Sequence, residues 1–232
     1  MSTIDHRPSN NGRGSAAWFQ PWTHIRFDRR SPGYCRVTFH HPPINAITAT
    51  TVAELAELVG LIEEDQDLNV VVFDSANPDF YLADSAGPHA MHAWLDLLVR
   101  LSRAPVVSIA SIRGRARGAG SEFVLACDLR FASRENASLG HFQVGTGVVA
   151  GGGPTATLCR LVGRGRALEI VLVADDLDGP RAEQYGYVNR LVADDRLEEE
   201  VDQIASRLAG FDHDVIARTK SCLDQVEALP DG

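Results

Sequence analysis

The chain has 232 residues, of which 44% are hydrophobic and 23% are charged, values that are ordinary for a globular protein. Its net charge of -9 argues against a nucleic-acid partner, because no basic stripe rises above the acidic background. Every apolar run is shorter than the roughly 18 residues that a membrane span needs, so we expect no membrane partner. The polar residues 1–14 do not resemble a signal peptide, and a cytoplasmic location is the default expectation.

The order of the predicted elements indicates a mostly parallel α/β sheet. Residues 1–20 are rich in Ser, Asn, Gly and Arg and predict a disordered arm. Apolar runs and alternation predict strands at 22–27, 35–39, 68–73, 106–112, 129–132 and 188–192, with a turn at 28–33 between the first two. Apolar residues at helical spacing predict helices at 50–64, 88–102, 121–127, 154–162, 164–173, 180–186, 196–209 and 213–227. Strand and helix alternate from 35 to 192, so we expect one core domain at 21–195 and a helical segment at 196–232.

Metal-binding and disulfide patterns are weak in this sequence. The four cysteines are widely spaced and include no CxxC pair, which argues against a zinc site. His89 and His92 are three residues apart on a predicted helix, but no third ligand is evident. We therefore predict no metal site and a reducing compartment.

The segment RGRARGAGSEFVLACD, at 113–128, carries the most chemical information. Two glycine-rich turns, at 114–120 and 145–153, each precede a predicted helix. Glycines let the backbone turn sharply and approach a ligand, and the first amides of the following helix can bind an oxyanion. Glu122 lies in the first turn of the helix after the first of these turns. From the residues alone, glycines that serve only packing remain the commoner explanation.

With Ile112 included, this segment resembles the pattern (I/V)-N-G-x-A-x-G-G-G-x-E-L-A-x-A-C-D of the enoyl-CoA hydratase/isomerase, or crotonase, family. Arg113 replaces the usual Asn, and Ala119 replaces the middle glycine. Two further segments match in the family's order. HPPINAI, at 41–47, resembles H-P-P-x-N-A-L, and LGHFQVGTGVVAGGGPT, at 139–155, resembles F-G-x-P-E-x-x-x-G-x-x-P-G-x-G-G-T.

The resemblance implies a fold and a set of site residues. The fold is the ClpP/crotonase spiral of ββα units with C-terminal helices, shortened here. The backbone amide of Ala119 matches one oxyanion-hole donor, and that of Asp84 matches the other, because FYLADS at 80–85 looks like the family's F-x-A-G-x-D loop. Glu122 matches a catalytic glutamate of the hydratases. The residues expected to bind substrate are Ala83, Gly118, His141 and Gly151.

Gln143 is the main departure, because hydratases of the family usually have a second glutamate there. Hydration needs a base for water and an acid for the α-carbon, and a neutral amide exchanges no protons near neutral pH. Family isomerases often rely on a glutamate at this second position as well. The Asp84 side chain would add a carboxylate if it faced the pocket, although a loop carboxylate is more often simply solvated.

The resemblance implies an acyl-CoA thioester enzyme that stabilises an enolate. A hydratase/dehydratase-like lyase is the first reading, an enoyl-CoA isomerase the second, and an impaired thioester-binding homologue the third. Coenzyme A is then part of the substrate, with no permanently bound cofactor, and a carrier-protein thioester stays open. Further C-terminal helices help family members to form trimers, so we expect a homotrimer or hexamer, with the short C-terminus leaving this open. Arg115 and Arg117 are candidates for phosphate contacts or, equally, for a solvated turn.

Overall fold

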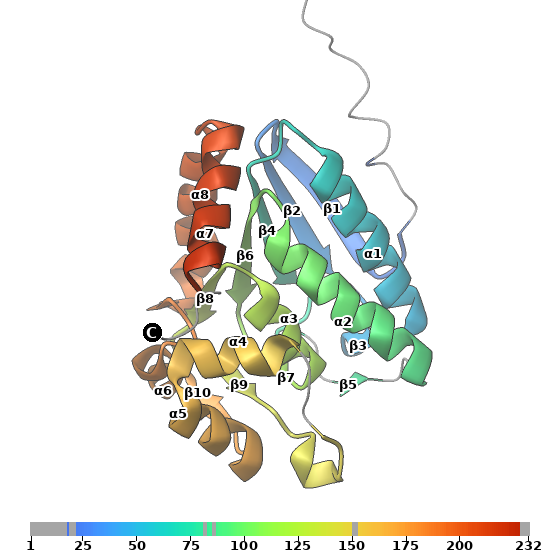
Figure 1. Ribbon diagram of the computed structural model, residues 1–232, viewed down its shortest axis with the longest axis vertical. Helices are drawn as coiled ribbons and strands as arrows, with labels where there is room; N and C mark the ends of the chain where they lie inside the picture. Colours follow the sequence, from blue (N-terminus) through green and yellow to red (C-terminus); the bar gives the residue numbers. More distant parts are fainter. Residues whose placement is uncertain (1–17, 19–21, 81–82, 85–86, 150–152, 228–232) are drawn as a thin grey trace, which may run out of the picture.

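The computed structural model describes residues 18, 22–80, 83–84, 87–149 and 153–227, and its centre is a six-stranded sheet (Figure 1). The strands lie in the order β1-β2-β4-β6-β8-β11. They are β1 (Ile25–Ser31), β2 (Tyr34–Phe39), β4 (Val70–Ser75), β6 (Val107–Ile112), β8 (Leu129–Ser133) and β11 (Arg190–Val192). β1 pairs with β2 antiparallel, and all the later neighbours in this sheet pair parallel. The prediction of a mostly parallel α/β sheet is confirmed.

Helices cover both faces of this sheet. Successive residues of β4 point to opposite faces: Val71 and Phe73 join the larger core cluster, which includes the apolar residues of α1 (Ala49–Glu64), whereas Val70 and Val72 pack with those of α7 (Leu197–Ala209). The run of valines in β4 is therefore apolar on both sides, as a covered parallel strand requires. In Figure 1, α1 and α2 (Gly87–Arg103) lie to the right of the sheet and α7 to the left.

Two smaller sheets flank the main one. One has the order β10-β9-β7, and the other pairs β3 with β5. Their strands are β3 (Ala46–Ile47), β5 (Ala83–Asp84), β7 (Arg115–Arg117), β9 (Ser138–Gly140) and β10 (Leu177–Asp178). These strands were not predicted from the sequence, because segments of two or three residues are too short for an alternation pattern. β7 lies inside the glycine-rich stretch that was predicted to be only a turn.

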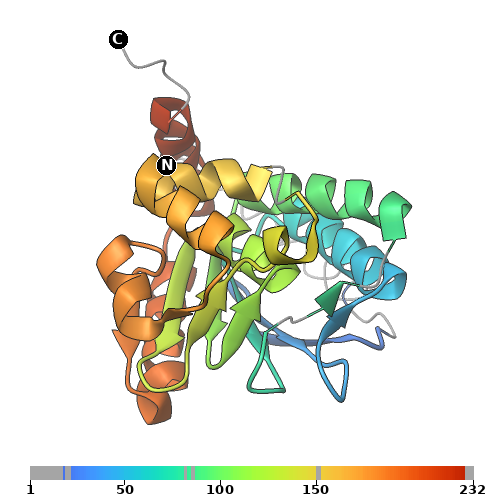
Figure 2. The ribbon, with the colours of Figure 1, turned by 90° about the horizontal axis from the view of Figure 1, so that it is seen from below.

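The remaining helices surround these strands. They are α3 (Ala119–Ala126), η1 (Val144–Thr146), α4 (Gly153–Val162), α5 (Arg164–Leu168), η2 (Glu169–Val173), α6 (Gly179–Tyr185), η3 (Asp194–Arg196) and α8 (His213–Glu227). α1, α2 and α4 form a layer above the strands when the molecule is seen from below (Figure 2). The helix predicted at 164–173 is divided, because α5 ends at Leu168 and a π-helical turn follows.

The first strand also differs from the prediction. A turn was expected at 28–33, but β1 continues to Ser31 and leaves only Pro32 and Gly33 to connect it to β2. β1 is an edge strand, and its alternate polar residues face solvent. The backbone hydrogen bonds between β1 and β2 can therefore continue through a polar sequence.

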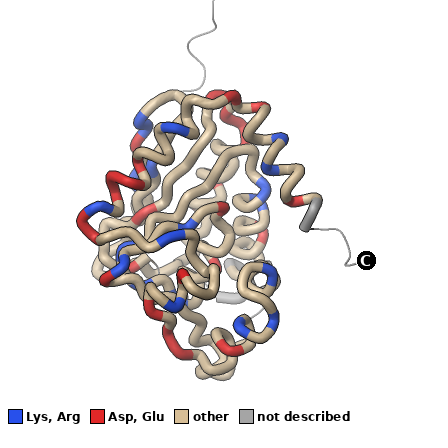
Figure 3. Tube along the Cα trace, turned by 90° about the vertical axis from the view of Figure 1, so that its left-hand side faces the viewer, with Lys and Arg blue, Asp and Glu red and all other residues tan. Residues whose placement is uncertain are grey.

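The C-terminal helices are fixed to the main sheet. Leu197, Val201 and Ala205 of α7 are buried in the cluster that includes Val70 and Val72. On α8, the Lys220 ammonium donates to Asp128 Oδ2 at 2.8 Å and to the Val106 carbonyl at 3.0 Å. Acidic and basic residues are interspersed along the trace (Figure 3). Within the described ranges, every helix falls short of the length and apolar character needed to cross a bilayer.

Candidate active site

Asn45, from the segment HPPINAI, connects the loop at 41–47 to the loop at 75–79. The Asn45 side chain is fully buried, and its Oδ1 accepts from the His41 amide at 2.9 Å and from Asn77 Nδ2 at 3.1 Å. Its Nδ2 donates to Ser75 Oγ at 2.6 Å and to the Asp79 carbonyl at 3.2 Å. The end of the first loop and the segment that follows the second pair as β3 and β5, with Ile47 opposite Asp84. One buried amide thus satisfies four partners and holds the two loops together.

Asp79 and Arg115 connect the same region to β7. The Asp79 carboxylate accepts from the Arg115 amide and from its Nε, both at 3.0 Å, and from Nη2 at 2.8 Å. The Arg115 guanidinium lowers the pKa of Asp79, and Asp79 raises that of Arg115. Arg117 forms an ion pair of 2.7 Å with Asp176 and lies over the Phe142 ring. Both arginines that were candidates for phosphate contacts or a solvated turn are therefore engaged in ion pairs within the chain.

The start of α3 needs glycine at position 118. Gly118 has φ of +56°, a backbone conformation that L side chains rarely adopt. A Cβ there would also lie 2.5 Å from the Phe142 ring. Ala119 is then the first residue of α3, and the Glu122 amide already donates to the Gly118 carbonyl at 3.0 Å. The amides of residues 119–121 precede this first intrahelical donor, and helix geometry leaves such N–H groups for other acceptors.

Glu122 is a buried carboxylate at this helix start. Its residue is 8% exposed, Oε2 accepts from Trp94 Nε1 at 3.0 Å, and Oε1 accepts from Gln143 Nε2 at 3.2 Å. Two N–H donors stabilise a buried negative charge, which would otherwise be costly. Trp94 itself is 2% exposed and packs against Phe123, so its indole is held by the core. The structure thus brings Glu122 and Gln143 together, as the sequence resemblance implies for residues 21 positions apart.

His141 lies behind this carboxylate rather than on an open surface. It is 1% exposed, and its Nε2 lies 3.2 Å from Ser121 Oγ and 3.4 Å from the Tyr187 hydroxyl. The Tyr187 hydroxyl also contacts Ser121 Oγ. Burial lowers the pKa of His141 to about 4, so the ring is neutral at neutral pH. A serine beside a histidine is the geometry of a nucleophile and its base, but Ser121 is fully buried and out of reach of a substrate.

The structure describes the other residues predicted to bind substrate only in part. Ala83 and Asp84 form β5, beside β3, and the structure describes their backbone but not their side chains. Gly151 lies outside the described residues. Three residues of this region were not predicted from the sequence: Trp94, Ser121 and Tyr187. Only Ser121 has a signal in the sequence, its place next to Glu122.

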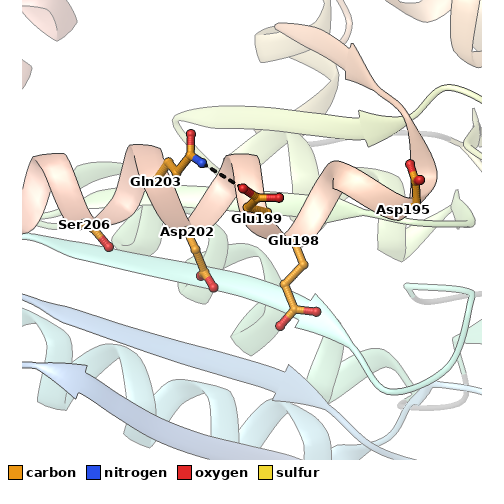
Figure 4. Close-up of a pocket in the computed structure, with 6 residues that line it drawn as sticks. All are labelled: Asp195, Glu198, Glu199, Asp202, Gln203 and Ser206. Carbon is orange, nitrogen blue, oxygen red and sulfur yellow. Dashed lines mark hydrogen bonds between the residues drawn. The ribbon is translucent and has the colours of Figure 1, made fainter.

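Two surface depressions lie elsewhere on the molecule. One, of about 690 Å³, lies beside α7 and is lined mainly by carboxylates (Figure 4). The other, of about 460 Å³, is lined by residues of α2, α3, α4 and α8. Their linings do not include Glu122 or Gln143, so neither depression is part of the candidate site.

This mostly parallel sheet with its two small flanking sheets has the crotonase fold of the solved structures that it matches. A protein from Streptomyces avermitilis, named as a candidate enoyl-CoA hydratase, is 42% identical, with a TM-score of 0.84 over 90% of this chain and 80% of its own. A monofunctional enoyl-CoA isomerase from M. smegmatis is 30% identical, with a TM-score of 0.79 over 90% of this chain and 95% of its own.

Sequence comparison agrees with the fold. The family model described as enoyl-CoA hydratase/isomerase matches residues 29–228. A short-chain-enoyl-CoA hydratase from Clostridium acetobutylicum is 30% identical over 184 residues, which are 74% of this chain and 70% of that protein. The chain belongs to the enoyl-CoA hydratase/isomerase family, and the resemblance and the fold class predicted from its sequence are confirmed.

Proposed function

We propose that this chain binds an acyl-CoA thioester and stabilises its enolate, with Glu122 moving the proton at the reacting carbon. One observation carries the proposal: Glu122 is held between Trp94 and Gln143, three residues into a helix that begins at Ala119. A carboxylate that is buried, oriented from two sides and adjacent to helix-start amides is suited to proton transfer next to a polarised carbonyl.

The oxyanion hole in this proposal consists of the backbone amides of Ala119 and Asp84. β5 packs near α3, so the two amides belong to neighbouring elements. Each such donor contributes about 3–4 kcal/mol to the stabilisation of a developing oxyanion. Ala83, Gly118 and Gly151 would shape the backbone around the thioester, since a glycine or alanine lets the chain approach a ligand closely.

Gln143 orients rather than transfers protons. A carboxylate only accepts hydrogen bonds, so Gln143 Nε2 faces Glu122 Oε1 at 3.2 Å and the amide oxygen is left to accept from a bound donor. That oxygen is buried and has no hydrogen-bond partner among the described residues. A water or hydroxyl held there would lie beside Glu122, and a hydratase/dehydratase-like lyase step is the first candidate reaction.

Two other readings stay open, although a glutamine at position 143 counts against an isomerase as it does against a hydratase. An isomerase moves one proton between two carbons, so a single carboxylate such as Glu122 can serve it alone. A thioester-binding protein with impaired turnover is the other, because the second carboxylate is absent at Gln143. Each reading takes coenzyme A as part of the ligand, and a carrier-protein thioester is a further form of it. We also propose a cytoplasmic homotrimer or hexamer, a core domain at 21–195 and a helical segment at 196–232.

The test is a panel of enoyl thioesters offered to the unaltered chain and to Glu122→Gln. Hydration is followed by loss of the enoyl-thioester absorbance, isomerisation by its gain, and binding by calorimetry. We expect turnover that Glu122→Gln reduces about 100- to 10,000-fold, the usual contribution of a general acid–base group. Equal turnover in a folded variant would contradict the role of Glu122. Binding without turnover by both forms would favour the thioester-binding reading.

A further inference from the structure

A buried polar cluster lies directly behind the candidate site and has no part in the chemistry proposed above. Ser121, His141 and Tyr187 are each no more than 1% exposed, and their polar atoms contact one another. Within the described residues, the hydrogen-bonding contacts of His141 are made by Nε2, and its Nδ1 has no partner. Three polar side chains in an apolar core are costly to bury unless they satisfy one another.

The three residues come from three separate segments. Ser121 is in the first turn of α3, His141 directly follows β9, and Tyr187 lies between α6 and β11. Tyr187 is fixed in turn, because its carbonyl accepts from Arg130 Nε at 2.8 Å. Arg130 also donates to the Cys127 carbonyl at 2.6 Å. Cys127 caps the other end of α3, so buried hydrogen bonds hold α3 at its first turn and at its last.

The cluster adjoins both polar groups of the site. Ser121 directly precedes Glu122, and His141 lies two residues before Gln143. The 3.2 Å contact between Gln143 Nε2 and Glu122 Oε1 therefore joins the same two segments that the Ser121–His141 contact joins. A hydrogen bond of that length weakens steeply when the segments separate by a few tenths of an ångström to one ångström.

We propose that Ser121, His141 and Tyr187 form a positioning unit that sets the distance between Gln143 and Glu122. The effect of the unit on kcat rests on the proposed function, whereas its effect on the distance between Gln143 and Glu122 does not. The neutral ring of His141 is suited to this role, because it can accept or donate at Nε2 without bringing a second charge next to Glu122. Ser121 and Tyr187 supply hydroxyls that can donate to Nε2 or accept from it, so Nε2 has a partner in either tautomer.

The first experiment compares His141→Leu with His141→Gln, whose amide can restore a polar contact where Nε2 lies. With the best thioester found in the panel, we expect His141→Leu to lower kcat about 10- to 100-fold with little change in KM, as a displacement near 1 Å does. His141→Gln should recover most of that loss. Tyr187→Phe, which keeps the ring and removes the hydroxyl, should lower kcat by a smaller factor in the same direction. Ser133→Ala, at an equally buried serine that ends β8, is the matched control and should change kcat by less than about twofold, since it lies in no contact of the unit.

A second comparison separates positioning from general stability. In a Gln143→Ala background there is no amide left to position, so His141→Leu should cause no further loss of kcat. Equal factors in both backgrounds would overturn the proposal. So would a His141→Leu variant with lowered melting temperature and unchanged kcat.

A third measurement does not depend on activity. A crystal structure of folded His141→Leu should show Gln143 Nε2 beyond hydrogen-bonding distance of Glu122 Oε1, whereas Ser133→Ala should retain the 3.2 Å contact. An unchanged contact in His141→Leu overturns the positioning unit even if no thioester is turned over. A lengthened contact in a chain without turnover supports the unit and counts against the proposed function alone.

Discussion

Gln143→Glu is the substitution that most sharply tests the account of the site. The amide nitrogen of Gln143 lies 3.2 Å from Glu122 Oε1, and the glutamate side chain is nearly isosteric, so the new oxygen would take almost the same place. Two full negative charges at that separation repel by about 5 kcal/mol at an effective dielectric constant near 20. The pair avoids this repulsion by keeping one proton up to about neutral pH, so that only one of the two carboxyl groups is charged. One carboxyl group is then an acid and the other a base, which is what hydration requires.

The unaltered chain should therefore hydrate a simple enoyl-CoA such as crotonyl-CoA slowly or not at all, and Gln143→Glu should hydrate it faster by about 100-fold or more. The assay is the loss of enoyl-thioester absorbance at matched protein concentration. Gln143→Ala is the control, because it removes the amide without adding a carboxyl group and should show no gain. The reasoning is refuted if the unaltered chain already turns over at about 10 per second or more. It is also refuted if Gln143→Glu binds the thioester and is no faster than Gln143→Ala.

Three further predictions follow from the geometry. Ala119→Pro should abolish thioester activation, because proline is accepted at the first helical position and has no amide hydrogen to donate. Circular dichroism is the control for folding, and a folded variant with normal activity would place the donor elsewhere. Gly118→Ala should lower the free energy of unfolding by about 1–3 kcal/mol in urea titrations, since φ is +56° there and the Cβ meets Phe142; unchanged stability would contradict that strain. Burial lowers the pKa of His141 from 6.5 to about 4, so its contribution to stability is full above pH 6.5 and is lost as the pH falls toward 4. Between pH 7 and 4.5 the unfolding free energy should fall about 2 kcal/mol more in the unaltered chain than in His141→Gln, and parallel pH dependences would show that His141 is not buried neutral.

Residues that carry a periodic or a glycine pattern were predictable. The run of valines in β4 predicted a covered strand, and the spacing of Val52, Leu55, Leu58 and Ile62 predicted α1, where all four are buried. The glycines before Glu122 predicted a sharp turn into a helix, and Gly118 with its positive φ is the position that requires one. In each case the cause is local, because the backbone geometry or the alternation of faces lies within one short segment.

Contacts between distant segments were not predictable from the same patterns. Trp94 reaches Glu122 across 28 positions, and Tyr187 reaches Ser121 across 66. Trp94 lies on the apolar face of a helix and Tyr187 directly precedes a predicted strand, and at both places an aromatic residue indicates only core. The role of Arg115 was left open by the sequence for the same reason, because its partner Asp79 belongs to another loop. β9 and β10 depend on pairing with each other and are too short to have a pattern of their own.

The central claim is that this site generates an enolate from a bound thioester, with Glu122 as the proton carrier. Exchange of the α-protons of butyryl-CoA for deuterium in heavy water, followed by nuclear magnetic resonance, measures that step whatever reaction follows it. We predict exchange with the unaltered chain and a loss of about 100-fold or more with folded Glu122→Gln at saturating thioester. Saturated binding with no exchange, or equal exchange rates in the two proteins, would contradict the claim.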